Sequence, residues 1–269
     1  MRGLIGVDIG GSGIKGATVD SRRGVLTSER IRVPTPQPAI PEAVVAATAG
    51  VIAALGPDEG PVGIGLPSPI VDGVAMAAAN IDKSWVGVNA VEAFSEAVGR
   101  PCTVLNDADG AGLAEIRFGA GKGVKGVVLM LTLGTGIGSA LFVDGALVPN
   151  LELGHIEIRG KDAERRASAG ARERRGLSYV DWAPLLDEYL DAVDRLIWPD
   201  LIILGGGISK RAEKFVPLLS ARPPVLAAAL RNEAGIVGAA VRARTLDAAP
   251  RAPRPRTTRA RRTPAGSAP

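Results

Sequence analysis

The chain has 269 residues, of which 46% are hydrophobic, 22% are charged and only 3% are aromatic. This composition predicts a globular protein of one large or two modest domains, with a core built from aliphatic side chains. The single cysteine, Cys102, excludes a disulfide framework within the chain and any zinc site with several cysteines. The first residues hold no long apolar run, so we expect no signal peptide, no membrane span and a cytoplasmic location.

The positive charge of the chain is concentrated near its end. Residues 242–269 contain eight arginines and one acid, a net charge of +7, so the rest carries −3 of the total +4. This tail is rich in Pro, Arg, Ala and Thr and has almost no large apolar residues, which predicts disorder because it cannot bury enough surface to fold. It is either an inert extension or an arm that binds polyanions, and we expect no specific nucleic-acid recognition.

The first half of the chain alternates short strands with helices. Residues 3–33 predict strand, glycine turn, strand, tight turn and strand, and the proline-rich PTPQPAIP then breaks the pattern. Residues 42–55 have the length and apolar density of a helix. Short buried strands at 60–73, a helix at 91–99 and a strand at 102–107 follow.

The second half begins with a helix at 108–119 and then repeats the opening pattern over 125–148. Residues 161–175 are charged and helical or looped. Residues 177–197 predict a long amphipathic helix with Ser178 as its N-cap. A buried strand leads into a glycine turn at 199–209, and the last helix is expected at 232–243.

An internal repeat relates the two halves. Residues 8–20 align without a gap on residues 132–144, so that Gly10 meets Gly134 and Asp20 meets Asp144. Similar strands precede and follow both segments. Two copies of one hairpin unit predict two similar α/β domains that face each other.

Three glycine-rich loops, each after an apolar strand, favour phosphate binding, because glycine lets backbone N–H groups approach an anion closely. A Rossmann fingerprint would lead into a helix, whereas the first two loops lead into strands, and a Walker A motif is absent. An acid beside the first loop, Asp8, suits a water-mediated contact to phosphate-bound Mg²⁺, and Lys15 either meets a phosphate or faces solvent. The predicted phosphate-binding residues are Asp8, Gly10, Gly11, Ser12, Gly13, Lys15, Gly134, Thr135, Gly136 and Gly138.

The order of motifs DIGGSGIKG, LND, LTLGTGIGSALFVDG, ELGH and LGGG resembles the ROK family of sugar kinases. Within that family the chain is similar to the polyphosphate-dependent glucokinases of actinobacteria. The resemblance implies two actin-like ATPase (ribonuclease H-like) domains flanking a cleft, over residues 1–105 and 106–241, with the last helix packing back on the first domain. It also implies a homodimer. Typical members carry three zinc-binding cysteines after the GH pair, which this chain lacks, so no zinc is expected.

The resemblance also implies roles for particular residues. Asp107 is expected to be the catalytic base, although an N-cap of the following helix is the alternative. The only histidine, His155, is expected to bind a sugar hydroxyl rather than a metal. Trp85 either packs or lines the sugar side. The expected sugar ligands are Asn80, Asn106, Asp107, Glu152, His155 and either Glu164 or Glu157, and the nucleotide-side loop is Gly205, Gly206 and Gly207.

The resulting hypothesis is an Mg²⁺-dependent kinase that converts glucose to glucose 6-phosphate with inorganic polyphosphate, and ATP stays open as a second donor. One alternative is an ATP-only kinase of another hexose. The other is a non-catalytic ROK-type regulator, which is disfavoured because the phosphate motif begins at residue 4. A polyphosphate chain needs a basic track out of the cleft. The candidates are Lys122, Lys125, Arg165, Arg166, Arg172, Arg174 and Arg175.

Overall fold

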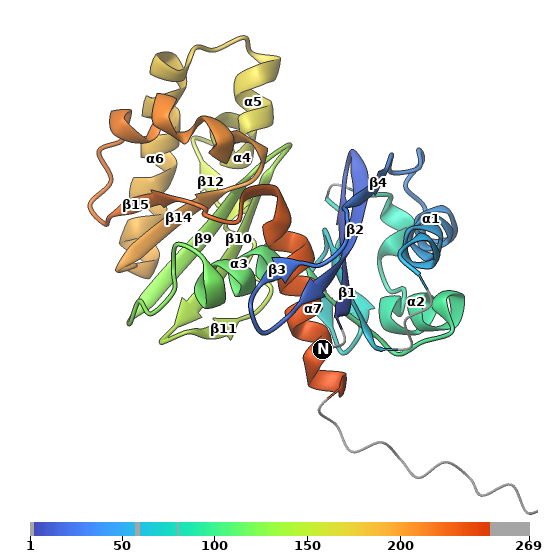
Figure 1. Cartoon of the computed structure of the whole chain (residues 1–269). Helices are drawn as coiled ribbons and strands as arrows, with labels where there is room; N and C mark the ends of the chain where they lie inside the picture. Colours follow the sequence, from blue (N-terminus) through green and yellow to red (C-terminus); the bar gives the residue numbers. More distant parts are fainter. Residues whose placement is uncertain (1–2, 57–59, 80, 248–269) are drawn as a thin grey trace, which may run out of the picture.

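The computed structural model describes residues 3–56, 60–79 and 81–247. It contains two lobes, each built on a mixed β-sheet, with two helices packed between the sheets (Figure 1). No helix of the described part is both long and apolar enough to cross a membrane.

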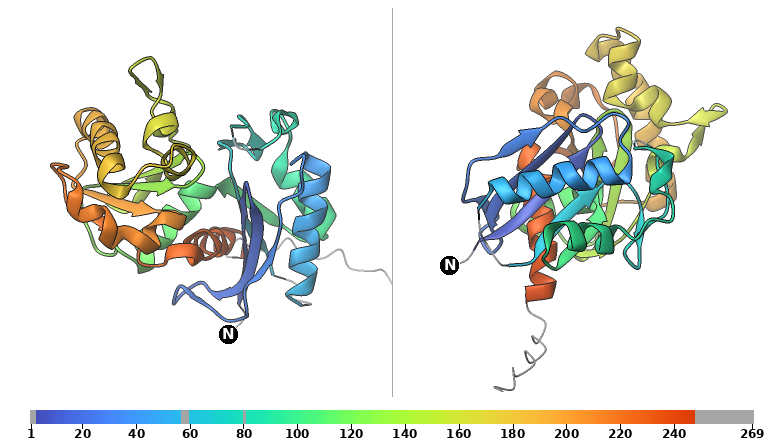
Figure 2. Two further views of the ribbon diagram at one scale, coloured as in Figure 1. Left: turned by 90° about the horizontal axis from the view of Figure 1, so that it is seen from above. Right: turned by 90° about the vertical axis from the view of Figure 1, so that its right-hand side faces the viewer.

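The N-terminal sheet has the strand order β3-β2-β1-β5-β8, with β4 pairing on β2. Its first hairpin is antiparallel, and β1, β5 and β8 are parallel to one another. The strands are β1 (Leu4–Gly10), β2 (Gly13–Asp20), β3 (Val25–Leu26), β4 (Ile31–Val33), β5 (Val62–Leu66) and β8 (Cys102–Asn106). Helices α1 (Pro41–Ala54) and α2 (Ala90–Val98) cover its outer face (Figure 2).

The C-terminal sheet repeats this topology with the order β11-β10-β9-β14-β15. Here β9 and β10 form the antiparallel hairpin, and β14 and β15 extend the sheet in parallel. The strands are β9 (Val127–Leu133), β10 (Ile137–Val143), β11 (Ala146–Val148), β14 (Leu201–Gly205) and β15 (Val225–Ala227). The matching order confirms the internal repeat predicted from the sequence.

The remaining elements are shorter or connect the sheets. Helix α6 (Tyr179–Ile197) covers the outer face of the C-terminal sheet, and α4 (Glu164–Ala167) and α5 (Ala169–Arg174) lie beside it. The hairpins are β6 (Ile70–Val71) with β7 (Val74–Ala75) and β12 (Glu157–Ile158) with β13 (Lys161–Asp162). The 3-10 turns are η1 (Lys83–Trp85), η2 (Leu153–His155), η3 (Gly207–Lys214), η4 (Val216–Leu218) and η5 (Arg231–Glu233).

A shared core joins the two lobes. Helices α3 (Asp107–Phe118) and α7 (Ala234–Asp247) lie between the sheets (Figures 1 and 2). The core contains Leu4 and Val19 from the first sheet, Phe142 and Ile203 from the second, and Ile236 from α7, all at most 6% exposed. Burying these aliphatic surfaces together makes the two lobes depend on the same helices.

Helix α7 approaches its neighbours closely enough to touch their backbones. A Cβ placed on Gly63 of β5 would lie 1.8 Å from the carbonyl oxygen of Ala239, and one on Gly238 would lie 1.7 Å from that of Gly110 in α3. Real Cβ atoms do not occur at such distances. Glycine at these positions therefore decides how closely the last helix can pack between the sheets.

The last helix is longer than predicted. It runs to Asp247, so the assignment of residues 242–247 to a disordered tail is wrong. Val241 and Ala243 are buried, and the Arg244 side chain donates to the carbonyl oxygen of Ser21 at 3.3 Å, so packing on the first lobe continues the helix. The other residues of the predicted tail, 248–269, lie outside the described part of the chain.

A buried carboxylate fixes the chain where it enters the last helix. Glu115 of α3 has no exposed surface, and its oxygens accept hydrogen bonds from the backbone N–H groups of Ala120, Ala229 and Leu230 at 2.7 to 3.0 Å. The bonds from Ala229 and Leu230 connect α3 to the segment between β15 and α7, and the bond from Ala120 holds the turn after α3. A carboxylate with three N–H donors is well satisfied in a buried position.

We expect Gly63→Ala to lower the free energy of unfolding by about 1 to 3 kcal/mol or more, because the added methyl group forces α7 away from the sheet. Chemical denaturation monitored by circular dichroism measures this change. Gly50→Ala in α1 is the matched control, since nothing lies within 4 Å of a Cβ there and alanine favours the helix. Equal stability of the two variants would contradict the close-packing explanation.

Candidate active site

A cavity of about 430 Å³ opens between the lobes where the strands of both sheets end. Residues from both halves of the chain line it. They include Gly11, Ser12, Gln37, Asn106, Asp107, Thr132, Gly134, Thr135, Gly136, Gly138, Glu152, His155, Glu164 and Gly206. The structure thus brings together residues that lie nearly 200 positions apart, as expected for a site at the carboxyl ends of strands in an α/β protein.

Asp107 is the first residue of α3, directly after β8. The N-cap is Asn106, whose side-chain oxygen accepts from the N–H groups of Ala108 and Asp109 at 2.9 and 3.2 Å. The Asp107 carboxylate accepts from the N–H of Ala108 at 2.8 Å. Because the neighbouring asparagine caps the helix, the capping role considered for Asp107 is not needed, and its carboxylate lines the cavity.

The environment of Asp107 raises its pKa to about 7. Burial is the main cause because it disfavours the charged form, and the negative charge of Asp8 is the next. The hydrogen bond from Ala108 acts in the opposite direction, while Glu152 and Asp109 add to the increase. A carboxylate with a pKa near neutrality can accept a proton and release it again at physiological pH.

The two glycine turns predicted to bind phosphate face this carboxylate from opposite sheets. Gly11 and Ser12 form the turn between β1 and β2, and Gly134, Thr135 and Gly136 form the turn between β9 and β10. All five line the cavity.

The β1–β2 turn is supported by residues that sequence reasoning missed. Thr35 donates to the carbonyl oxygen of Gly10 at 2.5 Å, Gln37 to that of Gly11 at 3.5 Å and Arg32 to that of Ser12 at 3.3 Å. Arg32 lies in β4, and Thr35 and Gln37 follow that strand without a recognisable motif.

Asp8 and Lys15 do not line the cavity but lie in the two strands that flank the first turn. They are partners in the β1–β2 hairpin, and Lys15 Nζ lies 3.1 Å from Asp8 Oδ2. Lys15 therefore pairs with Asp8, and its contact with a phosphate stays a prediction. Gly10 and Gly13 are the last and first residues of the flanking strands and shape the turn without lining the cavity.

The candidate magnesium ligand, Asp8, suits a cation that is already bound to the phosphates of the donor. Within the residues described, no three His, Cys, Asp or Glu side chains form a group able to hold a metal ion by themselves. Asp8 contacts Lys15 through Oδ2, and the negative charge of its carboxylate is near enough to Asp107 to raise the pKa of Asp107. Mg²⁺ keeps several waters and takes few protein ligands, which one carboxylate beside a phosphate turn can supply.

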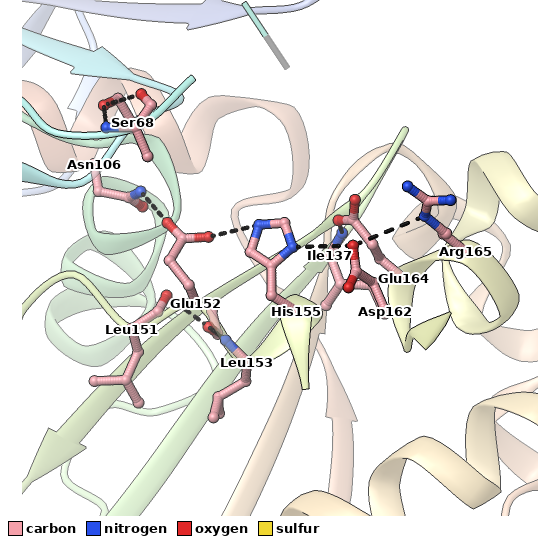
Figure 3. Close-up of polar contacts among 12 residues, drawn as sticks. Ser68, Asn106, Ile137, Leu151, Glu152, Leu153, His155, Asp162, Glu164 and Arg165 are labelled. Carbon is pink, nitrogen blue, oxygen red and sulfur yellow. Dashed lines mark hydrogen bonds and ion pairs between the residues drawn. The ribbon is translucent and has the colours of Figure 1, made fainter. Parts of the chain in front are cut away.

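The opposite side of the cavity carries a row of polar side chains (Figure 3). Asn106 Nδ2 donates to Glu152 at 3.4 Å, and His155 lies between two carboxylates, 3.7 Å from Glu152 and 3.6 Å from Asp162. Burial raises the pKa of Glu152, while His155 acts against the increase. These groups offer donors and acceptors to several neighbouring hydroxyls.

The ELGH segment is held in place by the second sheet. Ser139 of β10 donates to the carbonyl oxygen of Leu151 at 2.8 Å and accepts from the N–H of Leu153 at 2.9 Å. A Cβ on Gly154 would lie 2.3 Å from the carbonyl oxygen of Ile137. The glycine of this motif therefore lets the segment lie directly on β10, which orients Glu152 and His155 toward the cavity.

The structure separates the two candidates for the further carboxylate. Glu164 lines the cavity, and its Oε2 accepts from the N–H of Ile137 at 3.0 Å, beside the second glycine turn. Glu157 lies on the short β12–β13 hairpin, is exposed and does not line the cavity. The expectation for Glu157 is therefore corrected in favour of Glu164, because the hairpin turns Glu157 toward solvent.

Only some of the remaining predicted residues line the cavity. Gly206 lines the cavity and Gly207 lines an adjacent hollow, whereas Gly205 is the buried end of β14. Trp85 is fully buried, stacks on Phe94 and donates to the backbone of Ala39, which confirms the packing interpretation. Asn80 lies outside the described residues.

A pair of hydrogen bonds between the lobes was also missed. The Asn150 side chain, which follows β11, accepts from the N–H of Ile70 and donates to its carbonyl oxygen, both at 2.9 Å. The buried Asp109 accepts from the N–H of Asn150 at 3.0 Å. A residue of one lobe is thereby tied to the backbone of the other.

Two repeated sheets around a cleft, with a carboxylate between two glycine turns, define the class of actin-like two-lobed kinases. The sequence pattern of the ROK family matches residues 4–172, and the chain belongs to the ROK family. The polyphosphate glucokinase of Mycobacterium tuberculosis is 52% identical over 237 residues, which cover 88% of this chain and 89% of that protein.

Solved structures agree with this assignment. The inorganic polyphosphate/ATP-glucomannokinase of Arthrobacter sp. strain KM superposes with a TM-score of 0.89 at 55% identity, covering 91% of this chain and all of that one. A ROK family glucokinase of Streptomyces griseus, solved with glucose and AMPPNP, gives 0.78 at 28% identity, over 90% and 99% of the two chains. The predicted fold class is confirmed.

We expect Asp107→Asn to be more stable than the wild type at about pH 8 and equally stable at about pH 4. The pKa of about 7 in the folded protein lies above the unfolded value, so the stability linked to Asp107 is present below about pH 4 and is lost as the pH rises through about 7. Thermal unfolding at both pH values measures the difference. Glu96→Gln on the exposed face of α2 is the control, and a pH-independent difference would contradict the raised pKa.

Proposed function

We propose that this protein transfers a phosphoryl group from inorganic polyphosphate to the 6-hydroxyl of glucose, and that ATP serves as a second donor. The observation that carries the proposal is the position of Asp107, between two glycine turns on one side and the Asn106–Glu152–His155 row on the other. The Mycobacterium and Arthrobacter relatives, which cover most of the chain, are a polyphosphate glucokinase and a polyphosphate/ATP-glucomannokinase.

In this proposal Asp107 acts as the general base. It accepts the proton of the 6-hydroxyl while the sugar oxygen forms a bond to the terminal phosphorus of the donor. The bond from that phosphorus to the bridging oxygen breaks, and the electron pair leaves with the shortened chain. A pKa of about 7 suits the task, because about half of the carboxyl groups are ionised at pH 7 and the carboxylate is basic enough to take the proton.

The glycine turns of both sheets hold the donor. The turns at 10–13 and 134–138 present backbone to the phosphates from opposite lobes, which fixes the donor in line with the sugar hydroxyl. Asp8 would hold a water of phosphate-bound Mg²⁺, and the ion would neutralise charge on the phosphate oxygens. Lys15 orients Asp8 through their 3.1 Å contact.

The polar row selects the sugar. Glu152 and Glu164 accept from hydroxyls, while His155 and Asn106 can both donate and accept. Asn106 also caps α3, so the residue that contacts the sugar is tied to the backbone that carries Asp107. We propose a cytoplasmic homodimer as well, on the family resemblance.

The direct test is glucose 6-phosphate formation with Mg²⁺ and glucose or mannose, with polyphosphate and ATP supplied separately. We expect turnover with polyphosphate, and kcat/KM that rises with pH to a plateau above about 7 because the base must be ionised. Asp107→Asn should lower kcat by about 10² to 10⁴-fold, whereas Glu96→Gln should not change it. Turnover with ATP alone would favour the ATP-only hexokinase, and sugar binding without turnover would favour a regulator.

A matched pair of substitutions tests the sugar contacts. We expect Glu164→Gln to raise KM for glucose about tenfold or more, because a charge-assisted hydrogen bond is lost, and Glu157→Gln to leave it unchanged. The amide oxygen of glutamine can still accept from Ile137, so the second glycine turn keeps its support. Steady-state kinetics with saturating donor give both values, and an equal effect of the two variants would show that the cavity does not bind the sugar as proposed.

A further inference from the structure

A second hollow adjoins the cavity on the side of the C-terminal lobe. Its volume is about 780 Å³, and it shares Gly134 and Thr135 with the cavity. The third glycine loop lies at the boundary, with Gly206 lining the cavity and Gly207 lining the hollow. A ligand held at the second glycine turn can therefore extend directly into this hollow.

The hollow is lined by four cations, Arg172 and Arg174 of α5 with Arg211 and Lys214 of η3, against one acid, Glu173. In the described part of the chain, none of the four lies within 4.0 Å of a carboxylate oxygen, whereas Arg166 pairs with Glu188 at 3.1 Å. Unpaired cations collected around one hollow produce a positive potential that attracts an anion.

Two of these cations lie near groups that orient them. A Cβ on Gly170 would be 3.0 Å from Arg174 Nη1 and 2.8 Å from the carbonyl oxygen of Thr135, so the Arg174 side chain and the glycine turn both pack against Gly170. The Arg172 guanidinium lies 4.1 Å from the ring centroid of Tyr179, and its buried Nε has no hydrogen-bond partner. An oriented guanidinium with unused donors is suited to phosphate oxygens.

The aromatic character of the hollow is limited. Tyr179, its one aromatic lining residue, stacks on Phe215 and carries the Arg172 guanidinium on its ring. A purine would find little free aromatic surface, whereas a chain of phosphates would meet a cation at several successive positions. The chemistry of the lining therefore favours a polyanion over a nucleoside.

The other basic residues suggested by the sequence lie elsewhere. Lys122 and Lys125 precede β9, so the seven residues of that strand, about 20 Å, separate them from the turn at its far end. Arg165 lies 3.8 Å from Asp162, and Arg166 lines a different hollow on the outer side of α6. Arg175 does not line the hollow, and Arg211 and Lys214 were not among the candidates.

Given the function proposed above, on which this inference rests, we propose that the hollow binds the part of the polyphosphate chain beyond the phosphates held by the glycine turns. Arg174, Arg211 and Lys214 contact this distal segment, and Arg172 fixes its entry. A short donor such as tripolyphosphate is held mainly at the turns. Long chains should therefore bind more tightly than short ones, through the residues of η3 and α5.

The test compares the wild type with the triple variant Arg174→Gln/Arg211→Gln/Lys214→Gln in the kinase assay. We expect KM for long-chain polyphosphate to rise about tenfold or more, and KM for tripolyphosphate, KM for glucose and kcat to change little. The KM for long chains should also depend less on salt in the variant, because fewer charge contacts are screened. An unchanged kcat shows that the fold is intact.

Two control variants remove exposed charges elsewhere. Arg22→Gln/Arg23→Gln, in the turn between β2 and β3, should leave every parameter unchanged. A larger effect of Lys122→Gln/Lys125→Gln than of the triple variant would overturn the proposal by placing the track at the other end of β9. A raised KM for ATP with an unchanged KM for long polyphosphate would also overturn it, because the hollow would then be a nucleotide site only.

The outcome also separates this inference from the proposed function. If the wild type does not use polyphosphate, the proposed donor is wrong and the inference fails with it. If the wild type uses polyphosphate and the triple variant keeps the same KM for long and short chains, only the assignment of the hollow fails.

Discussion

The packing of α7 against β5 and α3 is the contact on which the rest of the molecule depends. Backbone meets backbone at Gly63 and Gly238, where no side chain would fit. The helix belongs to the end of the chain but lies on the first sheet, while α3 follows the first sheet and packs on the second. The two helices join the lobes through a shared core, and Glu115 ties α3 to the segment before α7 by two hydrogen bonds.

This arrangement places the chemistry at one point. Because α3 starts where β8 ends, Asp107 lies at the boundary between the lobes, and the hairpin turns of both sheets face it. Acidic groups collect there: Asp8, Asp109 and Glu152 all disfavour the ionised form of Asp107. The residues that raise the pKa of Asp107 enable it to accept a proton. The same residues make its ionised form destabilising for the folded protein at neutral pH, and strongly shifted pKa values are common at functional sites.

Acidic and basic side chains lie in different parts of the cleft. The cavity around Asp107 is acidic, whereas the adjoining hollow carries four cations and one acid. A polyanion entering an acidic cavity needs compensating charge, which the backbone of the glycine turns, the proposed Mg²⁺ and the proposed cationic hollow would supply at successive positions. The order of these groups along the cleft would align the terminal phosphate with the sugar.

The sequence by itself determined the elements that depend on local chemistry. Glycine turns after apolar strands, the repeat of residues 8–20 at 132–144 and the order of the motifs were sufficient for the two-lobed fold, the family and most residues of the cavity. Only the tertiary structure decided matters that depend on which surfaces meet. Glu164 lines the cavity and Glu157 does not, Lys15 pairs with Asp8, and α7 extends to Asp247 because it packs on the first lobe. The tertiary structure also joined Arg211 and Lys214 to Arg172 and Arg174, because side chains about 40 positions apart become neighbours only when η3 and α5 fold around the same glycine turn.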